Sequence, residues 1–456
     1  MSDLFRKKSL ALILSDSTDT TDGGHSLKRT LSTLNLIALG IGAIIGAGIF
    51  VRTAAAAGNN AGSGVVYSFI LAGIGCGFAG LCYAELAAMI PVAGSAYTYT
   101  YATLGELIAW IIGWDLVLEY ALGAATVSIA WSEYLVNLLH HFGWIIPYQW
   151  CHSPFDASAA GVHGLVNIPA LFILMVLTGL LIKGTQESAT VNAIIVAIKL
   201  AIVLVFIAVG WGFITPAHHT PFLPENTGEF GSFGWSGVFR GAAVVFFAYI
   251  GFDAVSTAAQ EAKNPQKGMP IGILGSLVIC TVLYILFAWV LTGVASYKDF
   301  GSAGAGHEAS VAYAIQHYMP GYEWLATLIT IAILAGFSSV ILVMLLGQSR
   351  VFFSLSRDGL MPKIFSELHP KWRTPWKSNL ILLVLVGVFG GFVPGNVVGD
   401  MTSIGTLFAF VLVCVAVIIL RLRNRDAERP FKTPFVPFVP IMGVLVCGSL
   451  CKMPRR

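Results

Sequence analysis

Long apolar runs separated by short polar loops fill the chain from about residue 31 onward. A helix needs about 20 apolar residues to cross the hydrocarbon core of a bilayer. The runs predict spanning helices near residues 34–56, 64–90, 104–138, 167–184, 189–212, 235–258, 271–295, 323–346, 379–393 and 403–421, with a final apolar piece at 436–451. The pattern therefore predicts an all-α polytopic membrane protein embedded in a lipid bilayer.

The composition agrees with this class and excludes several others. The chain has 456 residues, of which 56% are hydrophobic and 11% charged, and its mean hydropathy is +0.80. So few charges cannot coat a soluble globule of this size. The net charge is only +3 and the basic residues are scattered, so nothing indicates nucleic acid as a partner. The seven cysteines and the histidines of the 139–166 loop lack metal-ligand spacing, so we expect no metal and no cofactor.

The loops divide the basic residues very unevenly. When loops are assigned alternately from the N-terminus, nearly all Lys and Arg residues fall on one side, and only Arg52 and Lys298 lie on the other before the final apolar piece. The positive-inside rule then predicts a cytoplasmic N-terminus in the cell membrane. We expect residues 1–30 to form a disordered cytoplasmic arm. We expect residues 422–456 to form a cytoplasmic loop followed by a partial eleventh helix. Alternation would place the basic tail of that helix outside, so we expect the second helix of this hairpin to be missing.

A basic amphipathic stretch follows the eighth span. Residues 348–362 interleave Ser and Arg with apolar residues and end in Gly and Pro. Such a pattern is typical of a helix that lies on the cytoplasmic membrane surface. A solvated connecting loop explains it equally well, so both interpretations stay open.

Four glycines interrupt the first span, at Gly40, Gly42, Gly46 and Gly48. An ordinary spanning helix has no local need for so many residues that weaken helical preference, so the cluster indicates a place where the helix opens and exposes backbone groups. Gly42 and Gly46 also fit a G-x-x-x-G packing face against a neighbouring helix. This stretch alone does not choose between the two interpretations.

Lys199 lies near the middle of the fifth span and is flanked by aliphatic residues. At a rise of about 1.5 Å per residue, it is about 15 Å from either end of the helix. Ionisable groups are expensive at this depth, and burial disfavours their charged form. Lys199 is therefore a candidate for taking up and releasing a proton, the alternatives being a lysine that reaches an interface or one that pairs with a carboxylate.

Three acidic residues also lie inside predicted spans. Asp115 and Glu119 are four residues apart, hence on one helix face, so either one is protonated or each has a partner. Glu119 could receive a cationic side chain of a substrate or act as a structural hydrogen-bond partner. Asp253 follows a single glycine in the sixth span. An intramembrane aspartyl protease using Asp115 and Asp253 would need a Gly-x-Gly-Asp setting, which is absent, and nothing resembles the repeated pore loop of a channel.

Several motifs together resemble the amino acid-polyamine-organocation transporter superfamily, and more closely its cationic amino acid transporter branch. They are GAIIGAGIF at residues 42–50, AELA at 84–87, PVAGSAY at 91–97, FAYIGFD at 247–253 and EAKNP at 261–265. The resemblance implies a five-plus-five inverted repeat, with residues 31–212 matched by residues 213–421. It also implies that spans one and six are broken at mid-membrane around the substrate.

The same resemblance implies a binding site made largely of backbone. Amides at the start of the second half of span one would hold the substrate carboxylate, and the residues implied are Gly46, Ala47 and Gly48. Freed carbonyls of both breaks would hold its ammonium, and the residues implied are Ile44, Phe247, Ala248 and Ile250. Ala47 departs from the family, which usually has Thr or Ser there.

Lys199 matches a lysine of proton-coupled members, close to Ser338 and Ser339, and Glu119 matches an acidic residue of cation transporters. Phe337 could narrow the pocket. The expected function is therefore not enzymatic. We expect a secondary active transporter that imports a neutral or cationic amino acid with a proton by alternating access, with an amino acid exchanger as the alternative.

Overall fold

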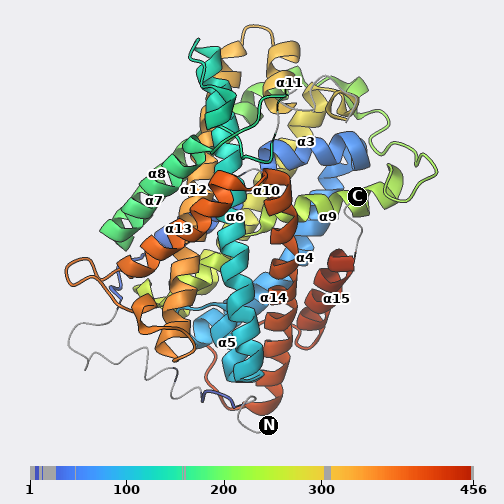
Figure 1. Ribbon diagram of the computed structural model, residues 1–456. Coiled ribbons are helices and arrows are strands. Elements are labelled where there is room, and N and C mark those ends of the chain that lie inside the picture. The colour runs from blue at the N-terminus through green and yellow to red at the C-terminus, as the bar shows by residue number, and fades with distance from the viewer. Residues whose placement is uncertain are drawn as a thin grey trace.

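The computed structural model describes residues 6–9, 13, 27–46, 48–156, 158, 161–301 and 310–452. These residues form an elongated helical bundle (Figure 1). Its principal helices are α2 (Thr33–Ile44), α4 (Val65–Met89), α6 (Glu106–His141), α7 (Ile168–Lys183), α8 (Thr185–Gly210), α9 (Gly234–Phe246), α10 (Pro265–Val294), α12 (Glu323–Arg357), α13 (Trp376–Phe392), α14 (Gly395–Arg423) and α15 (Phe438–Lys452).

Shorter helices connect these elements. They are α3 (Thr53–Ala56), α5 (Ala96–Thr103) and α11 (Ser310–Tyr318), the π-helices η1 (Gly48–Arg52) and η2 (Ala57–Ala61), and the 3-10 helices η3 (Gly62–Gly64), η4 (Tyr148–Trp150), η5 (Trp211–Phe213), η6 (Pro216–His219), η7 (Phe247–Tyr249), η8 (Asp253–Glu261), η9 (Tyr297–Phe300) and η10 (Lys363–Phe365).

Every apolar run predicted from the sequence contains a helix. Six helical stretches of the described chain are long and apolar enough to cross a membrane. Four shorter apolar helices, α2, α7, α13 and α15, fall in other predicted spans. The fold is thus the all-α polytopic membrane fold that the hydrophobic pattern predicted.

Two spans are interrupted where the glycine pattern and the family motifs predicted. The first span ends its regular helix at Ile44 and resumes as η1 at Gly48. The sixth span leaves α-helical geometry after Phe246, passes through η7 and a turn, and continues as η8. Gly251 in that turn has φ of +116°, which strongly favours glycine, and a Cβ there would lie 2.7 Å from the Cβ of Ala43. The two breaks therefore lie against each other.

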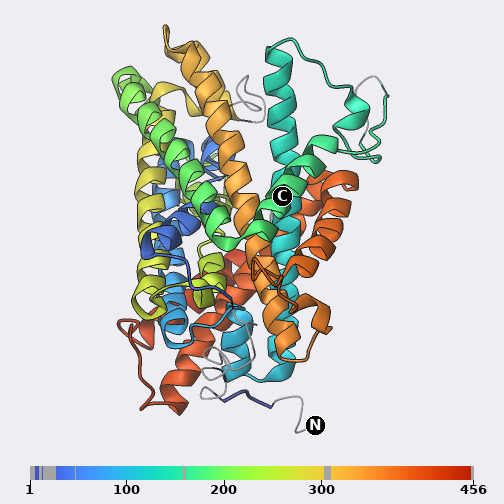
Figure 2. The same ribbon diagram turned by 90° about the vertical axis from the view of Figure 1, so that its left-hand side faces the viewer.

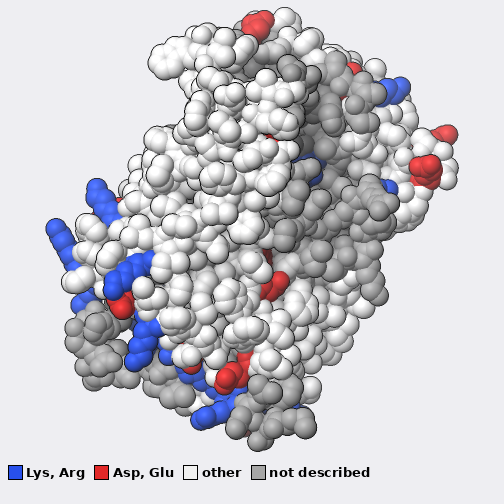
Figure 3. Space-filling view, in the orientation of Figure 1, with Lys and Arg blue, Asp and Glu red and all other residues white. Residues whose placement is uncertain are grey.

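The remaining helices pack around these two spans. Helix α10 lies along α2 and α4, and α6 lies along α12 and α14 (Figures 1 and 2). In Figure 3, Lys and Arg side chains gather along the lower left of the molecule. Helices α7, α12 and α14 finish there, in Lys183, Arg357 and Arg423. We call this the basic end.

The stretch 348–362 is not a surface helix, and only residues 358–362 form the partly exposed connecting turn that the second interpretation predicted. Its first ten residues continue α12 to Arg357 without interruption, and side chains from Gln348 to Ser356 are buried. The physical reason is that the polar face of this segment packs against protein. Arg350 is 1% exposed because a carboxylate, Glu261 at the end of η8, neutralises it.

Candidate functional site

The two broken spans touch directly at Gly48 and Ala248. A Cβ on Gly48 would overlap the backbone and side chain of Ala248, and one on Gly46 would lie 2.6 Å from a methyl group of Val340 in α12. Glycine is required at both positions by this close approach. The residues expected to offer carbonyls, Ile44, Phe247, Ala248 and Ile250, all lie at the breaks, whereas Ala47 lies outside the described residues.

Tyr284 of α10 joins the two breaks through its hydroxyl group. The oxygen lies 2.8 Å from the carbonyl oxygen of Ile44 and 2.8 Å from that of Ala248, and the side chain is fully buried. A tyrosine hydroxyl carries a single proton, so it donates to one of these carbonyls at a time. Sequence reasoning missed Tyr284, because a lone tyrosine in an apolar helix gives no local signal of its partners.

Lys199 of α8 is fully buried and reaches the break of the first span. Its Nζ donates to the carbonyl oxygens of Gly42 at 3.1 Å and Ile45 at 2.7 Å, and to Ser339 Oγ at 3.4 Å. Among the described residues no carboxylate lies within ion-pair distance of it. Lys199 therefore neither reaches an interface nor pairs with a carboxylate here. Its three acceptors match the three N–H groups of an ammonium.

The two serines of α12 differ in their partners. Ser339 Oγ donates to Asn192 Oδ1 of α8 at 2.8 Å, so it belongs to the surroundings of Lys199. Ser338 Oγ donates instead to the carbonyl oxygen of Leu334, one turn earlier on its own helix, at 2.9 Å. Asn192 also donates to the carbonyl oxygen of Ala38 in α2 at 3.1 Å. A polar network thus links α2, α8 and α12.

A second buried polar group lies beside the sixth span. Asp253 accepts a hydrogen bond from the Tyr120 hydroxyl at 2.8 Å and is fully buried. Glu119 is 2% exposed and lies close enough to Asp253 and Asp115 to interact with both electrostatically. In the described part of the chain neither Glu119 nor Asp253 forms an ion pair. Two like charges so placed are not both stable without a proton or a cation.

The basic end carries a buried ion-pair network. Arg350 Nη2 lies 2.7 Å from Glu261 Oε1, and its Nε donates to Glu261 Oε2 at 3.1 Å. Thr185, the first residue of α8, donates to Glu261 Oε1 at 2.7 Å. The backbone of Leu31 exchanges hydrogen bonds of 2.9 Å with Glu261 and Lys263. These contacts tie the starts of the first and fifth spans to the ends of the sixth and eighth.

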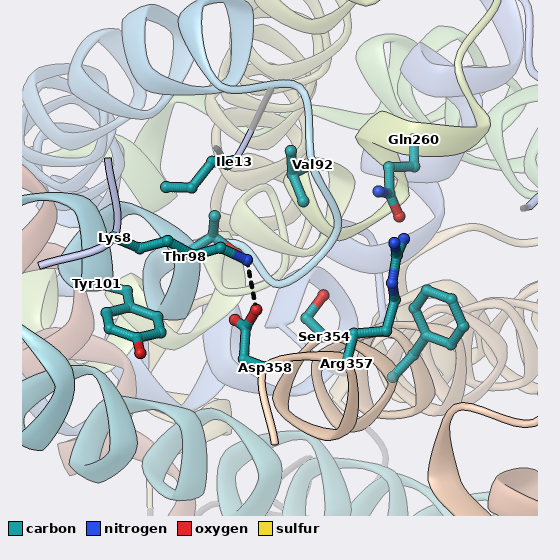
Figure 4. A pocket seen from close by; sticks show the side chains of 10 residues that line it. Lys8, Ile13, Val92, Thr98, Tyr101, Gln260, Ser354, Arg357 and Asp358 are labelled. Atoms are coloured by element: carbon teal, nitrogen blue, oxygen red, sulfur yellow. Dashed lines mark hydrogen bonds and ion pairs between the residues drawn. The ribbon is translucent and has the colours of Figure 1, made fainter. Parts of the chain in front are cut away.

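Residues of the N-terminal arm occupy the same end of the molecule. Lys8 forms an ion pair of 2.6 Å with Asp358 (Figure 4). Asp358 also accepts a hydrogen bond of 2.7 Å from the Tyr97 hydroxyl. Burial and the nearby Asp358 carboxylate raise the pKa of Tyr97 above its usual range, so the hydroxyl remains a donor. A cavity of about 110 Å³ is lined by Lys8 and Asp358, and also by Gln260 of η8. The described arm residues thus pack against the basic end.

Two interrupted spans that meet through exposed backbone, beside a buried lysine with only neutral partners, define a membrane transporter of the broken-helix class. The chain matches the family described as amino acid permease over residues 31–454. It belongs to that family, and its members are transporters, not enzymes.

Individual relatives agree. The chain is 45% identical to the branched-chain amino acid permease BcaP of Bacillus subtilis, with 97% of this chain and 91% of the relative covered. It is 41% identical to the methylthioribose transporter of the same species, with 98% and 92% covered. It is 40% identical to cationic amino acid transporter 9, chloroplastic, of Arabidopsis thaliana, with 97% and 76% covered. The matches support amino acid transport.

Proposed function

We propose that this protein imports an amino acid through the cell membrane together with a proton, by alternating access. The observation that carries the proposal is the position of Lys199. Two of its three hydrogen bonds link the coupling lysine to the backbone of the first break, and the third links it to Ser339 of α12. A change in its charge changes the strength of these bonds, because hydrogen bonds from an ammonium are about twice as strong as those from a neutral donor. The proton therefore acts on the same backbone that holds the substrate.

The α-carboxylate of the substrate binds the amides of Gly46, Ala47 and Gly48. Gly48 begins the resumed helix η1, and the helix dipole favours a negative charge at this N-terminal end. The α-ammonium binds carbonyls of the two breaks, at Ile44, Phe247, Ala248 and Ile250. The position of Tyr284 supports the assignment, because its hydroxyl lies within hydrogen-bond distance of the carbonyl oxygens of both Ile44 and Ala248. These two carbonyls therefore point toward the same donor position.

The side chain of the substrate is neutral and aliphatic. Phe337 of α12 is fully buried and packs edge-to-face on Tyr134 of α6, with ring centroids 5.5 Å apart. These two aromatic rings, which lie between α6 and α12, would form an apolar wall of the substrate site. The name of the Bacillus branched-chain amino acid permease supports the same substrate class. Glu119 would serve a cationic side chain instead, and its burial against Asp253 also suits a structural role.

The basic end faces the cytoplasm, and the N-terminus lies on that side. Residues 31–212 and 213–421 form the two repeats, whose first helices are the broken ones. The contacts of Glu261 and Leu31 then close the cytoplasmic path. They must separate when the substrate leaves.

Uptake by proteoliposomes tests the proposal. Wild-type protein should accumulate leucine when the outside is acidic, and Lys199→Met should lose this accumulation. Lys183→Met is the matched control, because Lys183 is an exposed lysine at the end of α7 and should behave as wild type. Unchanged proton-driven accumulation by Lys199→Met would remove Lys199 from the mechanism. Leucine counterflow that requires internal leucine under every gradient would favour an exchanger.

A further inference from the structure

We propose that Asn192 is a positioning residue for the coupling lysine: it holds the Ser339 hydroxyl as a hydrogen-bond acceptor and so completes the three-acceptor seat of the Lys199 ammonium. The inference rests on the proposed coupling role of Lys199. Neither family resemblance nor charge points to Asn192, which is a neutral residue on the inner face of α8. Its importance follows from the direction of the hydrogen bonds.

The direction of the Ser339 hydroxyl is fixed by its donor count. The group has one proton, and it is used in the 2.8 Å bond to Asn192 Oδ1. Only lone pairs of Ser339 Oγ are then directed at Lys199 Nζ, 3.4 Å away. Ser339 therefore accepts a hydrogen bond from Lys199 for as long as its own hydroxyl donates to Asn192.

The orientation of the Asn192 amide is fixed in turn by α2. Its NH₂ group donates to the carbonyl oxygen of Ala38 at 3.1 Å. A flipped amide would direct its oxygen at that carbonyl oxygen and leave two acceptors facing each other. The surrounding network thus permits one orientation, with the amide oxygen toward Ser339.

Gly42 makes this arrangement possible. A Cβ on Gly42 would lie 2.6 Å from Ser339 Oγ and 2.7 Å from Asn192 Oδ1, so any side chain would displace both. The carbonyl of the same residue accepts from Lys199 at 3.1 Å. The missing side chain of Gly42 therefore lets Ser339 and Asn192 pack closely against α2. This packing positions the acceptors of Lys199, in addition to bringing the helices together.

The groups facing Lys199 from the neighbouring helices are otherwise neutral. From α2 come the carbonyls of Gly42 and Ile45, and from α12 comes Ser339. From α10, the Cys280 thiol is the titratable group that interacts with it. With no charged side chain in direct contact among the described residues, the direction of a single hydroxyl group has a large relative effect.

The two protonation states of Lys199 need different partners. An ammonium donates three hydrogen bonds and suits three acceptors. A neutral amine donates two and has a lone pair, which requires a donor. When the Ser339 hydroxyl donates its hydrogen bond to Asn192, the three acceptors around Lys199 Nζ fit the ammonium. When Ser339 is free to rotate, its hydroxyl can donate to the neutral amine.

This arrangement connects proton release to movement of the first span. If α2 swings away at the basic end, Ala38 withdraws from Asn192, the amide loses its fixed orientation, and Ser339 can turn toward Lys199. The proton then passes from Nζ to water entering the hollow between α2, α8 and α12. Asn192, Ser188 and Thr185 of α8 line that hollow together with aliphatic side chains of all three helices. Its present volume of about 10 Å³ is too small for water, so water enters only after α2 has moved.

Two substitutions of opposite expected sign test the proposal. In Asn192→Leu the Ser339 hydroxyl loses its hydrogen-bond acceptor and becomes free to rotate, so it no longer has to accept from the ammonium. The pH of half-maximal uptake should therefore fall by about one unit, the size expected for one hydrogen bond to a charged group. In Asn192→Asp a carboxylate still accepts the Ser339 proton and adds a negative charge near the ammonium, so the midpoint should rise. Gln186→Leu, an exposed position on the same helix, is the control and should leave the midpoint unchanged.

The Lys199→Met background separates this inference from the proposed function. If Lys199→Met remains proton-driven, the coupling proposal fails and this inference fails with it. If Lys199→Met loses proton dependence while Asn192→Leu and Asn192→Asp keep the wild-type midpoint, only the positioning role is overturned. Shifts of both variants in the same direction would also overturn it, since a general disturbance of packing has no reason to reverse sign. The expected result is opposite shifts that vanish in the Lys199→Met background.

Discussion

Arg350 and Glu261 offer the sharpest test of how the basic end is held closed. The two side chains are 2% and 1% exposed, and two hydrogen bonds of 2.7 and 3.1 Å join them. Arg350→Met keeps much of the apolar stem but removes the charge. The Glu261 carboxylate then remains buried with the Thr185 hydroxyl as its side-chain donor. Breaking one partner of such a pair costs about 3–5 kcal/mol.

The free energy of unfolding, measured by denaturant titration in mixed micelles, should fall by that amount. Arg423→Met is the control, because Arg423 is exposed at the end of α14 and its loss should change stability by about 0.5 kcal/mol or less. The double variant Arg350→Met/Glu261→Met should recover most of the loss, since apolar replacement of both partners removes the uncompensated charge. A loss under about 1 kcal/mol for Arg350→Met would refute the reasoning, because that is the size expected of an exposed pair.

Four further substitutions have definite expected outcomes. Tyr284→Phe should weaken binding of neutral amino acids about tenfold in equilibrium binding, because the hydroxyl that links the carbonyls of the two breaks is lost. Glu119→Gln should weaken lysine and arginine binding more than alanine binding if it faces a cationic side chain, and equal effects on all three would indicate a structural role. Phe337→Ala should admit larger side chains in competition uptake, and an unchanged preference would exclude Phe337 from the pocket. Lys8→Met should lower the unfolding free energy by about 1–3 kcal/mol, between the values for an exposed and a buried ion pair, because the side chains of Lys8 and Asp358 are 15% and 12% exposed; no measurable loss would show that the arm does not hold the basic end.

Much of the fold could be predicted because the bilayer makes spans readable as apolar runs. The glycines of the first span indicated a break there without excluding a packing face, and the break of the sixth span was expected only because the family motifs imply it. Lys199 was found because charge at mid-membrane is rare. Each of these features depends on residues adjacent in sequence or on depth alone.

The features that were missed depend on distant contacts. Tyr284 and Asn192 are ordinary residues in apolar helices, and only the packing of α2, α8, α10 and α12 shows their partners. The 348–362 stretch was misinterpreted for a related reason. An amphipathic pattern shows that one face prefers a polar environment, but it does not tell whether water, lipid head groups or a buried carboxylate supplies it.

Lumenal pH in proteoliposomes during substrate uptake tests proton coupling most directly. With a pH-sensitive dye inside the vesicles and no gradient imposed, addition of external leucine should acidify the lumen when wild-type protein is present. Lys199→Met should give no acidification, and Lys183→Met should acidify as the wild type does. Leucine uptake by wild-type protein without any change in lumenal pH would contradict the account.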